Sequence, residues 1–243
     1  MCTVTYIPRN DGFVLTSSRD EKVKRPTLKP KVYLHNQVLL VYPKDEIAHG
    51  TWIAASNNKK IACLLNGAFR NHEKKDYYSK SRGQILINCF EYPSFLEAIE
   101  NLDLSNVEPF TLLLLDYSNE INFYQLVWDG EKKHVQSIPN NLPQIWSSVT
   151  LYSKKDREMR RIWFNNWIEN HKNHNNFDIL NFHKTKHSTI DSNDIVMKRE
   201  NDLQTVSISQ IKIYAEYQTF YYHDMIDESI TTLNLSELVC TQE

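Results

Sequence analysis

Apolar and polar residues alternate at the start of the chain, and this period of two predicts a β-hairpin. Residues 2–7 and 13–18 supply the two strands, and the Pro-Arg-Asn-Asp-Gly sequence at 8–12 supplies turn-forming residues between them. The charged cluster Arg19-Asp20-Glu21 follows directly. We therefore expect this cluster to lie where the second strand ends.

The polar stretch that follows contains Pro26 and Pro30 and predicts a loop, because proline interrupts regular backbone hydrogen bonding. A second hairpin is indicated farther along the chain. Its strands are expected at 50–56 and 61–67, on either side of the polar turn at 57–60.

Helical periodicity replaces the period of two over residues 81–102, where apolar residues recur at i, i+3 and i+4. Pro93 is expected to divide this segment into two helices. A further helix is predicted over residues 156–169, which place Met159 and three bulky apolar residues on one face and charges on the other.

The remaining apolar segments predict more strands. These are expected at 110–115, 122–128, 134–138, 205–214 and 219–223. Between them, the His- and Asn-rich segment 170–194 carries one short apolar piece at 177–182. Strands in runs and helices in separate blocks indicate an α+β protein with helices packed on sheets. With no internal repeat or long linker, residues 1–243 are expected to form a single domain.

Composition narrows the possible partners. The chain has 28 Lys and Arg residues against 30 Asp and Glu residues, so a net charge of −2 gives no basic field for nucleic acid. Its longest apolar run, at 112–115, is far shorter than the roughly 20 residues of a membrane-spanning helix. No basic and then apolar leader begins the sequence, so a cytoplasmic location is expected.

The four cysteines are widely spaced and include no CxxC pair, so reduced thiols are expected. They are Cys2, Cys63, Cys89 and Cys240. Only Cys2 stands out by position, because removal of Met1 would give it a thiol and a free α-amine on one carbon. These two groups can form a nucleophile with its own base.

The first hairpin offers this nucleophile two charged neighbours. Pairing the strands around the turn brings Cys2 opposite a residue near Ser18, with Arg19 and Asp20 beside the chain terminus. A guanidinium at Arg19 would favour the thiolate, and the carboxylate of Asp20 could hold or orient the α-amine. The α-amine has an intrinsic pKa of about 7.7 to 8.0, so part of it is unprotonated at neutral pH.

Several motifs occur in an order that resembles the NRDE family, also called the transport and Golgi organisation protein two family. The strongest matches are residues 1–6, 12–21, 50–54, 65–67 and 81–83, and weaker matches follow at 147–151 and 205–208. Two positions depart from the family pattern, since Ser18 and Ser148 stand where the family usually has asparagine.

The resemblance implies an N-terminal nucleophile hydrolase fold, in which two facing antiparallel sheets lie between helical layers in an αββα sandwich. Relatives with this fold, including bile salt hydrolase and penicillin V acylase, cleave linear amides with an N-terminal cysteine assisted by Arg and Asp. By this analogy Cys2 is the nucleophile, Arg19 and Asp20 are its partners, and Asn66 is a candidate oxyanion donor.

Two further residues are candidate substrate contacts. Arg82 lies at a helix entry after the capping residue Ser81 and could bind an acidic ligand. Trp52 could form a platform for a ligand, although a tryptophan at such a position is more often part of the core.

Two functions remain open at this point. The first is an amidohydrolase acting on a small-molecule amide without metal or cofactor. The second is a non-catalytic protein that binds or traffics a hydrophobic ligand, haem or lipid, as the resemblance also implies. Four histidines, His171, His174, His183 and His187, have spacings that could bind a metal, but their Asn- and Lys-rich surroundings favour a solvated loop.

Overall fold

The computed structural model describes residues 3–171 and 178–238 of the chain, and its strands there form two antiparallel sheets. The six-stranded sheet, sheet A, has the order β10-β1-β2-β11-β12-β13. Its strands are β1 (Thr3–Arg9), β2 (Gly12–Lys22), β10 (Gln144–Ser147), β11 (Leu203–Tyr214), β12 (Gln218–Asp224) and β13 (Ile230–Asn234). The N-terminal hairpin therefore lies inside the sheet, with β1 between β10 and β2.

The seven-stranded sheet, sheet B, is a meander whose strands follow one another in chain order. Its strands are β3 (Thr27–His35), β4 (Val38–Asp45), β5 (Ile53–Ser56), β6 (Lys60–Asn66), β7 (Phe110–Asp116), β8 (Asn122–Trp128) and β9 (Lys133–Ser137). Antiparallel neighbours follow one another along the chain, and between β6 and β7 the connection is long and contains the helices that cover this sheet.

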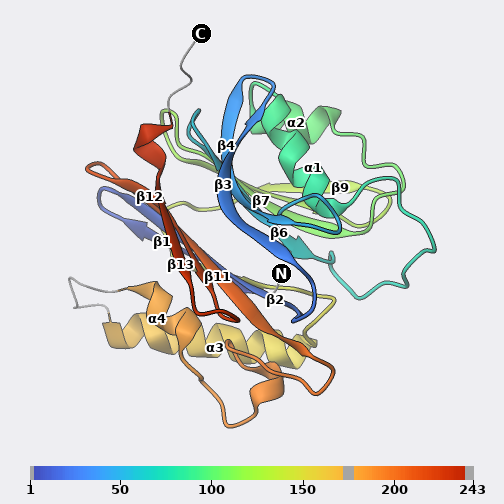
Figure 1. Ribbon diagram of the computed structural model, residues 1–243, viewed down its shortest axis with the longest axis vertical. Helices are drawn as coiled ribbons and strands as arrows, with labels where there is room; N and C mark the ends of the chain where they lie inside the picture. The colour runs from blue at the N-terminus through green and yellow to red at the C-terminus, as the bar shows by residue number, and fades with distance from the viewer. Residues whose placement is uncertain (1–2, 172–177, 239–243) are drawn as a thin grey trace.

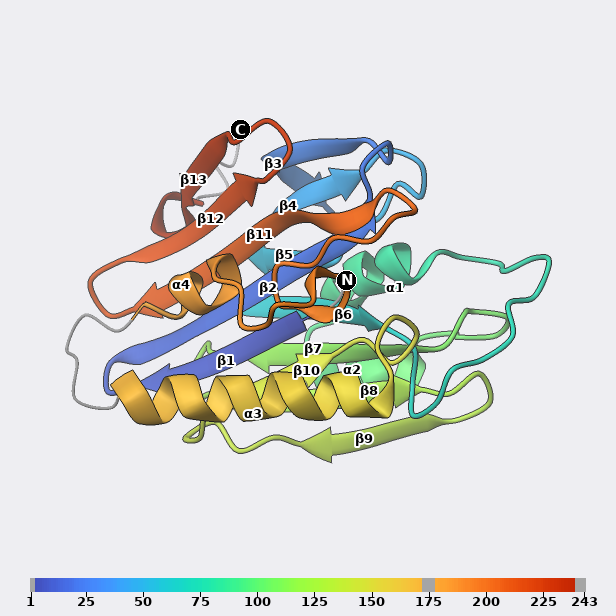
Figure 2. The same cartoon turned by 90° about the horizontal axis from the view of Figure 1, so that it is seen from below.

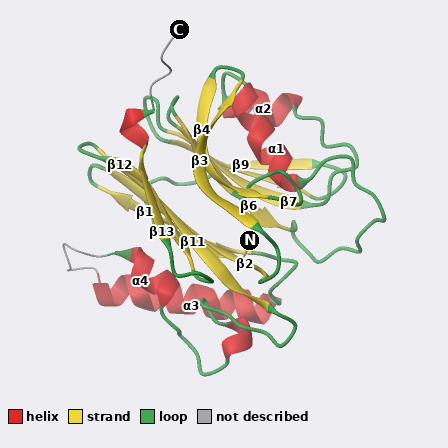
Figure 3. Ribbon diagram, in the orientation of Figure 1, coloured by secondary structure: helices red, strands yellow, loops and turns green. Residues whose placement is uncertain are grey.

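Helices cover the outer face of each sheet, so the molecule has four layers (Figures 1 and 3). Sheet B carries α1 (Arg82–Asn88), η1 (Cys89–Glu91) and α2 (Phe95–Asn101). Sheet A carries α3 (Lys154–His171) and α4 (Ile179–Lys184), and α3 runs along β1 and β10 in Figure 2. Two more single turns are η2 (Asp191–Asn193) and η3 (Leu235–Glu237). The predicted αββα arrangement is confirmed.

Two apolar cores hold the layers together. The larger core fills the space between the sheets and the space beneath α1 and α2, and it includes Tyr6, Phe13 and Phe123. The smaller core lies between sheet A and its helices, around Phe164 and Phe182. Burial of such side chains contributes roughly 1.5–3 kcal/mol each, which makes the apolar faces the main source of stability.

The sequence predicted both hairpins, the division of the first helical segment at Pro93, and the strands of sheet B from β5 to β9, and all are confirmed. The predicted loop containing Pro26 and Pro30 is wrong, because β3 and β4 occupy most of that region. Proline is tolerated in β3 because this is an edge strand, where one side needs no ladder hydrogen bond. The register of β3 against β4 also shifts between Leu28 and Lys31, around Pro30.

The short strands β10 and β13 were not predicted, because four or five polar-rich residues give too weak an alternation. In addition, β2 runs on to Lys22, so the charged cluster of residues 19–21 lies within the strand and does not mark its end. Within the described ranges, the structure contains no helix with the length and apolar character needed to span a membrane.

Two glycines explain why motifs far apart in the sequence occur together. A Cβ on Gly83 would lie 2.7 Å from the carbonyl oxygen of Thr51, and one on Gly50 would lie 2.4 Å from the carbonyl carbon of Gly83. The backbone N–H of Thr51 donates to the oxygen of Gly83 at 3.3 Å. The start of α1 thus packs backbone against backbone on the segment that precedes β5.

We expect Gly83→Ala to lower the free energy of unfolding by about 1–3 kcal/mol, because its methyl group would overlap backbone atoms that cannot rotate away. Urea denaturation measures the change. Glu100→Ala, on the exposed side of α2, is the control and should alter stability by less than about 0.5 kcal/mol. Wild-type stability in Gly83→Ala would contradict the close packing.

Candidate functional site

A cavity of about 440 Å³ opens where β2, the end of β6 and the start of α1 come together. Four of the residues predicted from the sequence line it: Arg19, Trp52, Asn66 and Arg82. They come from four motifs that are separated in the sequence, so the fold gathers them at one place. Cys2 lies outside the described residues, whereas the first described residue, Thr3, pairs with Ser18 next to Arg19.

Arg19 is only 3% exposed and is fixed from several sides. Its guanidinium donates hydrogen bonds to Asp45 Oδ2 at 2.8 Å and to Thr27 Oγ1 at 3.0 Å. The same group lies 4.4 Å from the ring centroid of Trp52, a cation–π distance. Burial lowers the pKa of Arg19, and the carboxylates of Glu21 and Asp45 oppose this effect. The result is a cation held in one orientation.

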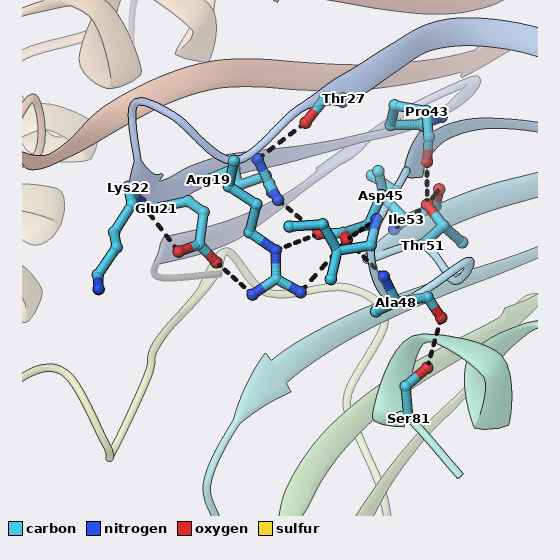
Figure 4. A network of polar contacts seen from close by, with 12 residues as sticks. Arg19, Glu21, Lys22, Thr27, Pro43, Asp45, Ala48, Thr51, Ile53 and Ser81 are labelled. Atoms are coloured by element: carbon cyan, nitrogen blue, oxygen red, sulfur yellow. Dashed lines mark hydrogen bonds and ion pairs between the residues drawn. The ribbon is translucent and has the colours of Figure 1, made fainter.

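Asp45 is the shared acceptor of this network (Figure 4). Its Oδ2 accepts from Arg19 and, at 2.7 Å, from Nε of Arg25. Its Oδ1 accepts from the backbone N–H groups of Ile47 and Ala48, at 3.1 and 2.9 Å. Burial alone raises the pKa of the Asp45 carboxyl, but the hydrogen bonds and the two guanidinium charges outweigh burial and lower it.

Trp52 serves as a wall of the cavity and as part of the core. It is 3% exposed, belongs to the larger apolar cluster and stacks on Arg19. Its indole Nε1 is buried without a hydrogen-bond partner among the described residues. The two interpretations made from the sequence, core residue and ligand platform, are therefore compatible at this position.

Asn66 ends β6 and lies between two cavities. Besides the first cavity it lines a second one of about 320 Å³, whose other walls come from β8, β10 and α3. Its backbone oxygen accepts a hydrogen bond from Ser148 Oγ at 2.9 Å. No hydrogen bond to its side-chain amide is found within residues 3–171 and 178–238. The amide is therefore available to a ligand that enters from either cavity.

Arg82 is the first residue of α1, which Ser81 and Gln84 cap reciprocally. Its guanidinium pairs with Glu108 at 3.1 Å, and Glu108 is also 3.2 Å from Nε2 of His72. Burial lowers the pKa of Arg82, and the charge of Glu108 opposes this effect. Arg82 thus lines the cavity as one member of an ion pair.

Asp20 faces the opposite side of sheet A from Arg19, because side chains alternate along β2. Its carboxylate accepts hydrogen bonds from Tyr152 Oη at 2.5 Å and from Thr205 Oγ1 at 2.6 Å. It is 4% exposed and lies within the layer between sheet A and its helices. Arg19 and Asp20, although adjacent in sequence, therefore lie on opposite faces of the sheet.

The two serines that depart from the family pattern both have partners. Ser18 Oγ lies 2.8 Å from Nδ1 of His183, and the other ring nitrogen of His183 lies 2.8 Å from Thr5 Oγ1. Ser148 donates to the carbonyl of Asn66 and lies 3.2 Å from Thr150 Oγ1. The hydroxyl of Ser18 is thus linked to β1 through His183, and that of Ser148 fixes the end of β6.

The sequence did not point to Asp45, Glu108, Arg160 or the role of His183. Asp45 follows the apolar run of β4, which lay unrecognised, and Glu108 precedes the predicted strand at 110–115. Arg160 is fully buried on α3 and lies 3.6 Å from the ring centroid of Tyr152. A charged residue on the apolar face of a helix was the available signal for Arg160.

Of the four histidines considered as metal ligands, three lie within the described residues, and each contacts other groups of the protein. His171 and His187 lie within hydrogen-bond distance of the backbone oxygens of Trp167 and Phe182, at 2.8 and 3.0 Å. His174 lies outside the described residues. Among the residues that the structure does describe, no three His, Cys, Asp or Glu side chains gather in an arrangement that could hold a metal ion.

Comparisons with known proteins relate this fold to a family and to solved structures. The family model described as Transport and Golgi organisation 2 matches residues 1–223. No curated protein matches the chain at the sequence level.

The solved structures that are similar in fold include a bile acid hydrolase variant and a penicillin acylase. A variant of conjugated bile acid hydrolase from Clostridium perfringens has a TM-score of 0.62 at 11% identity, covering 98% of this chain and 94% of that one. Penicillin V acylase from Agrobacterium tumefaciens has a TM-score of 0.63 at 11% identity, covering 98% and 87%. At this identity the similarity establishes the N-terminal nucleophile hydrolase-like fold.

We expect Asp45→Asn to lower the free energy of unfolding by about 3 kcal/mol, because it leaves the buried Arg19 guanidinium without its counter-charge. Urea denaturation at neutral pH measures the change. Asp227→Asn, which removes the exposed partner of Lys29, is the matched control and should have little effect. Equal effects of the two substitutions would contradict the importance of the buried pair.

His183 should make the fold sensitive to acid. Burial, with smaller contributions from Arg160 and His187, lowers the pKa of His183 to about 3, below the ordinary value of 6.5. Between these values the unfolded chain binds a proton that the folded chain does not, so stability falls as the pH decreases.

From pH 7 to pH 5 we expect this group to remove about 2 kcal/mol of folding stability. Urea denaturation of wild type and His183→Gln at both pH values measures this contribution, because the variant has no imidazole to protonate. An equal loss in both proteins would show that other groups cause the acid sensitivity.

Proposed function

We start from the fact that this chain belongs to the Transport and Golgi organisation 2 family, and we propose that it is an N-terminal cysteine amidohydrolase acting on a linear amide. One observation carries the proposal: a fixed cation, Arg19, and an available amide, Asn66, line the same cavity beside the pairing of Thr3 with Ser18. The fold is that of proteins described as a conjugated bile acid hydrolase and a penicillin V acylase, whose names supply the analogy.

In the proposed reaction, the α-amine of mature Cys2 takes the thiol proton and the thiolate attacks the amide carbonyl carbon. The side chain of Asn66 donates a hydrogen bond to the oxyanion that forms. As the C–N bond breaks, the α-ammonium gives its proton to the departing amine and leaves a thioester. The α-amine then takes a proton from water, whose oxygen attacks the thioester and releases a carboxylic acid and the thiol.

Arg19 would favour the thiolate by its charge. Its bonds to Asp45 and Thr27 and its stacking on Trp52 hold the guanidinium in place before any substrate arrives. Such preorganisation removes the need to reorient the charge during the reaction. Asp20 would act from the other face of the sheet, orienting the α-amine as one member of its network with Tyr152 and Thr205.

The two cavities support an amide that extends to both sides of Asn66. The first cavity has two more basic than acidic residues in its lining, with Lys74, Lys80 and Arg82 along one side, and suits an anionic group. The second cavity has apolar lining residues that include Phe69 and Trp146, together with the charged residues Lys154, Arg157, Glu158 and Arg161. Because Asn66 lines both cavities, a bound amide could extend one end into each with its carbonyl at Asn66. The proposal requires no metal or cofactor.

The second candidate function is non-catalytic binding of a hydrophobic ligand such as a lipid or haem. The apolar part of the second cavity's lining, which includes Phe69 and Trp146, favours it, since that surface would accept such a ligand whether or not Cys2 is reactive. The two functions differ in one respect that can be measured: only the first requires an activated thiol at the chain terminus.

The test is the rate of alkylation of each cysteine by iodoacetamide between pH 5 and pH 9, after loss of Met1 has been verified by intact mass. We expect selective labelling of Cys2 with a midpoint below the pKa of about 8.5 of a free thiol. Cys63 and Cys89 are internal controls, because burial raises the pKa of each to about 12.

Turnover completes the test with N-acyl amino acids and N-acyl amines of matched chain length. Cys2→Ala should abolish hydrolysis while preserving binding. Retained Met1, an ordinary Cys2 thiol, or turnover that survives Cys2→Ala would defeat the hydrolase proposal and favour the binding protein.

A further inference from the structure

The outer face of the N-terminal hairpin is unusual for a strand surface packed beneath helices, because it carries hydroxyl groups. Thr3, Thr5, Thr16 and Ser18 are all fully buried there. A buried hydroxyl without a partner costs free energy, so each needs a hydrogen bond from a neighbouring element. All four have one.

Three of the four hydroxyls have partners in the layer that covers sheet A, and the fourth has its partner within the sheet. Arg160 of α3 donates to Thr3 Oγ1, and Gln210 of β11 donates to Thr16 Oγ1 at 2.9 Å. The other two hydroxyls, those of Thr5 and Ser18, share a single partner, His183 of α4.

His183 joins the two strands that matter most to the proposed reaction. Its Nε2 reaches Thr5 on β1, the strand that leads to the chain terminus, and its Nδ1 reaches Ser18 on β2. Arg19 follows Ser18 directly and points to the opposite face, into the cavity. One imidazole thus ties the strand of the nucleophile to the strand of the cation from behind the sheet.

The ring makes both contacts while neutral, since one nitrogen donates and the other accepts, and a hydroxyl can do either. Burial keeps the ring neutral at ordinary pH. It lies on the face of β2 opposite to the cavity. It therefore cannot act on a substrate and can act only through the strands.

A chain terminus is the part of a strand most prone to fray, and in the proposed reaction the terminus is also the catalyst. Displacement of a reacting group by about 1 Å can cost on the order of 100-fold in rate. Directional hydrogen bonds restrain such displacement better than apolar contacts, because they depend on angle as well as distance.

We propose that His183 is a positioning residue that holds the N-terminal part of β1 against β2, so that the terminal nucleophile stays beside Arg19. The proposal rests on the proposed function in one respect, the role of Cys2 as nucleophile. The hydrogen bonds of His183 to Thr5 and Ser18 do not depend on that role, and the bond from Arg160 to Thr3 restrains β1 at a second position.

The experiment compares His183→Phe, which fills the site without polar atoms, with His183→Gln, which offers one donor and one acceptor. The first readout is the pH profile of Cys2 alkylation by iodoacetamide. We expect His183→Phe to slow labelling roughly ten-fold at pH values below the thiol pKa, the effect of a thiol pKa raised by one unit. His183→Gln should retain most of the wild-type rate.

The second readout is backbone hydrogen exchange of Val4, Thr5 and Tyr6, which reports on β1 without any thiol chemistry. We expect exchange roughly ten-fold faster in His183→Phe than in wild type. Phe182→Leu is the matched control, because it weakens the packing of the same helix and leaves both hydrogen bonds intact. It should change neither readout.

Unchanged β1 exchange in His183→Phe would overturn the proposal, as would equal changes in Phe182→Leu. If wild-type Cys2 proves to be an ordinary thiol, the proposed function fails and the exchange measurement alone decides the role of His183. Should His183→Phe not fold, Thr5→Val and Ser18→Ala remove the same bonds from the strand side and are expected to give the same two effects.

Discussion

The buried ion pair between Arg19 and Asp45 is the interaction on which the site depends. Arg19 belongs to β2 of sheet A and Asp45 ends β4 of sheet B, so this pair joins the two sheets across the interior. A guanidinium with so little exposure is stable only if its charge and its donors are matched. Thr27 and Trp52, also from the sheet B side, complete that match. Because Arg19, Asp45 and Trp52 also line the cavity, these contacts fix the position of that wall.

The period of two along β2 divides the chemistry of the site into two faces. Arg19 and Glu21 face the cavity, whereas Ser18 and Asp20 face the helices that cover sheet A. Each face solves a different problem. The cavity side presents fixed charge to a ligand, and the helix side fixes the strands that carry this charge. A substitution on the cavity face therefore changes the charge that a ligand meets. A substitution on the helix face changes the position of the strands that carry this charge.

Polar groups buried behind sheet A contribute less stability than apolar side chains of the same size would, because their bonds to water must be replaced. Their advantage is direction. The hydrogen bonds between the strand hydroxyls and the side chains of Arg160 and His183 can form in only a few relative orientations of helix and sheet. Apolar contacts depend less on orientation, and the larger core between the sheets, together with the smaller core around Phe164 and Phe182, supplies most of the stability. The apolar cores thus supply the stability, and the polar contacts fix the orientation of the helices on the sheet.

The sequence determined much of the fold, because periodicity is a local property. Alternation and helical spacing identified both hairpins and the helices of 81–102 and 156–169, and the motifs at residues 12–21 and 81–83 identified Arg19 and Arg82. The weak patterns of β3, β10 and β13 gave no such signal, since edge strands need little alternation and tolerate a residue such as Pro30.

Only the tertiary structure decided which charges meet. Asp45 and Arg19 are 26 residues apart, and Ser18 and His183 are 165 residues apart. No local pattern links such pairs, because each forms only after two separately specified elements have packed together. The same packing set the two faces of β2, placed Asn66 between two cavities, and buried His183 in a segment whose composition favoured solvent.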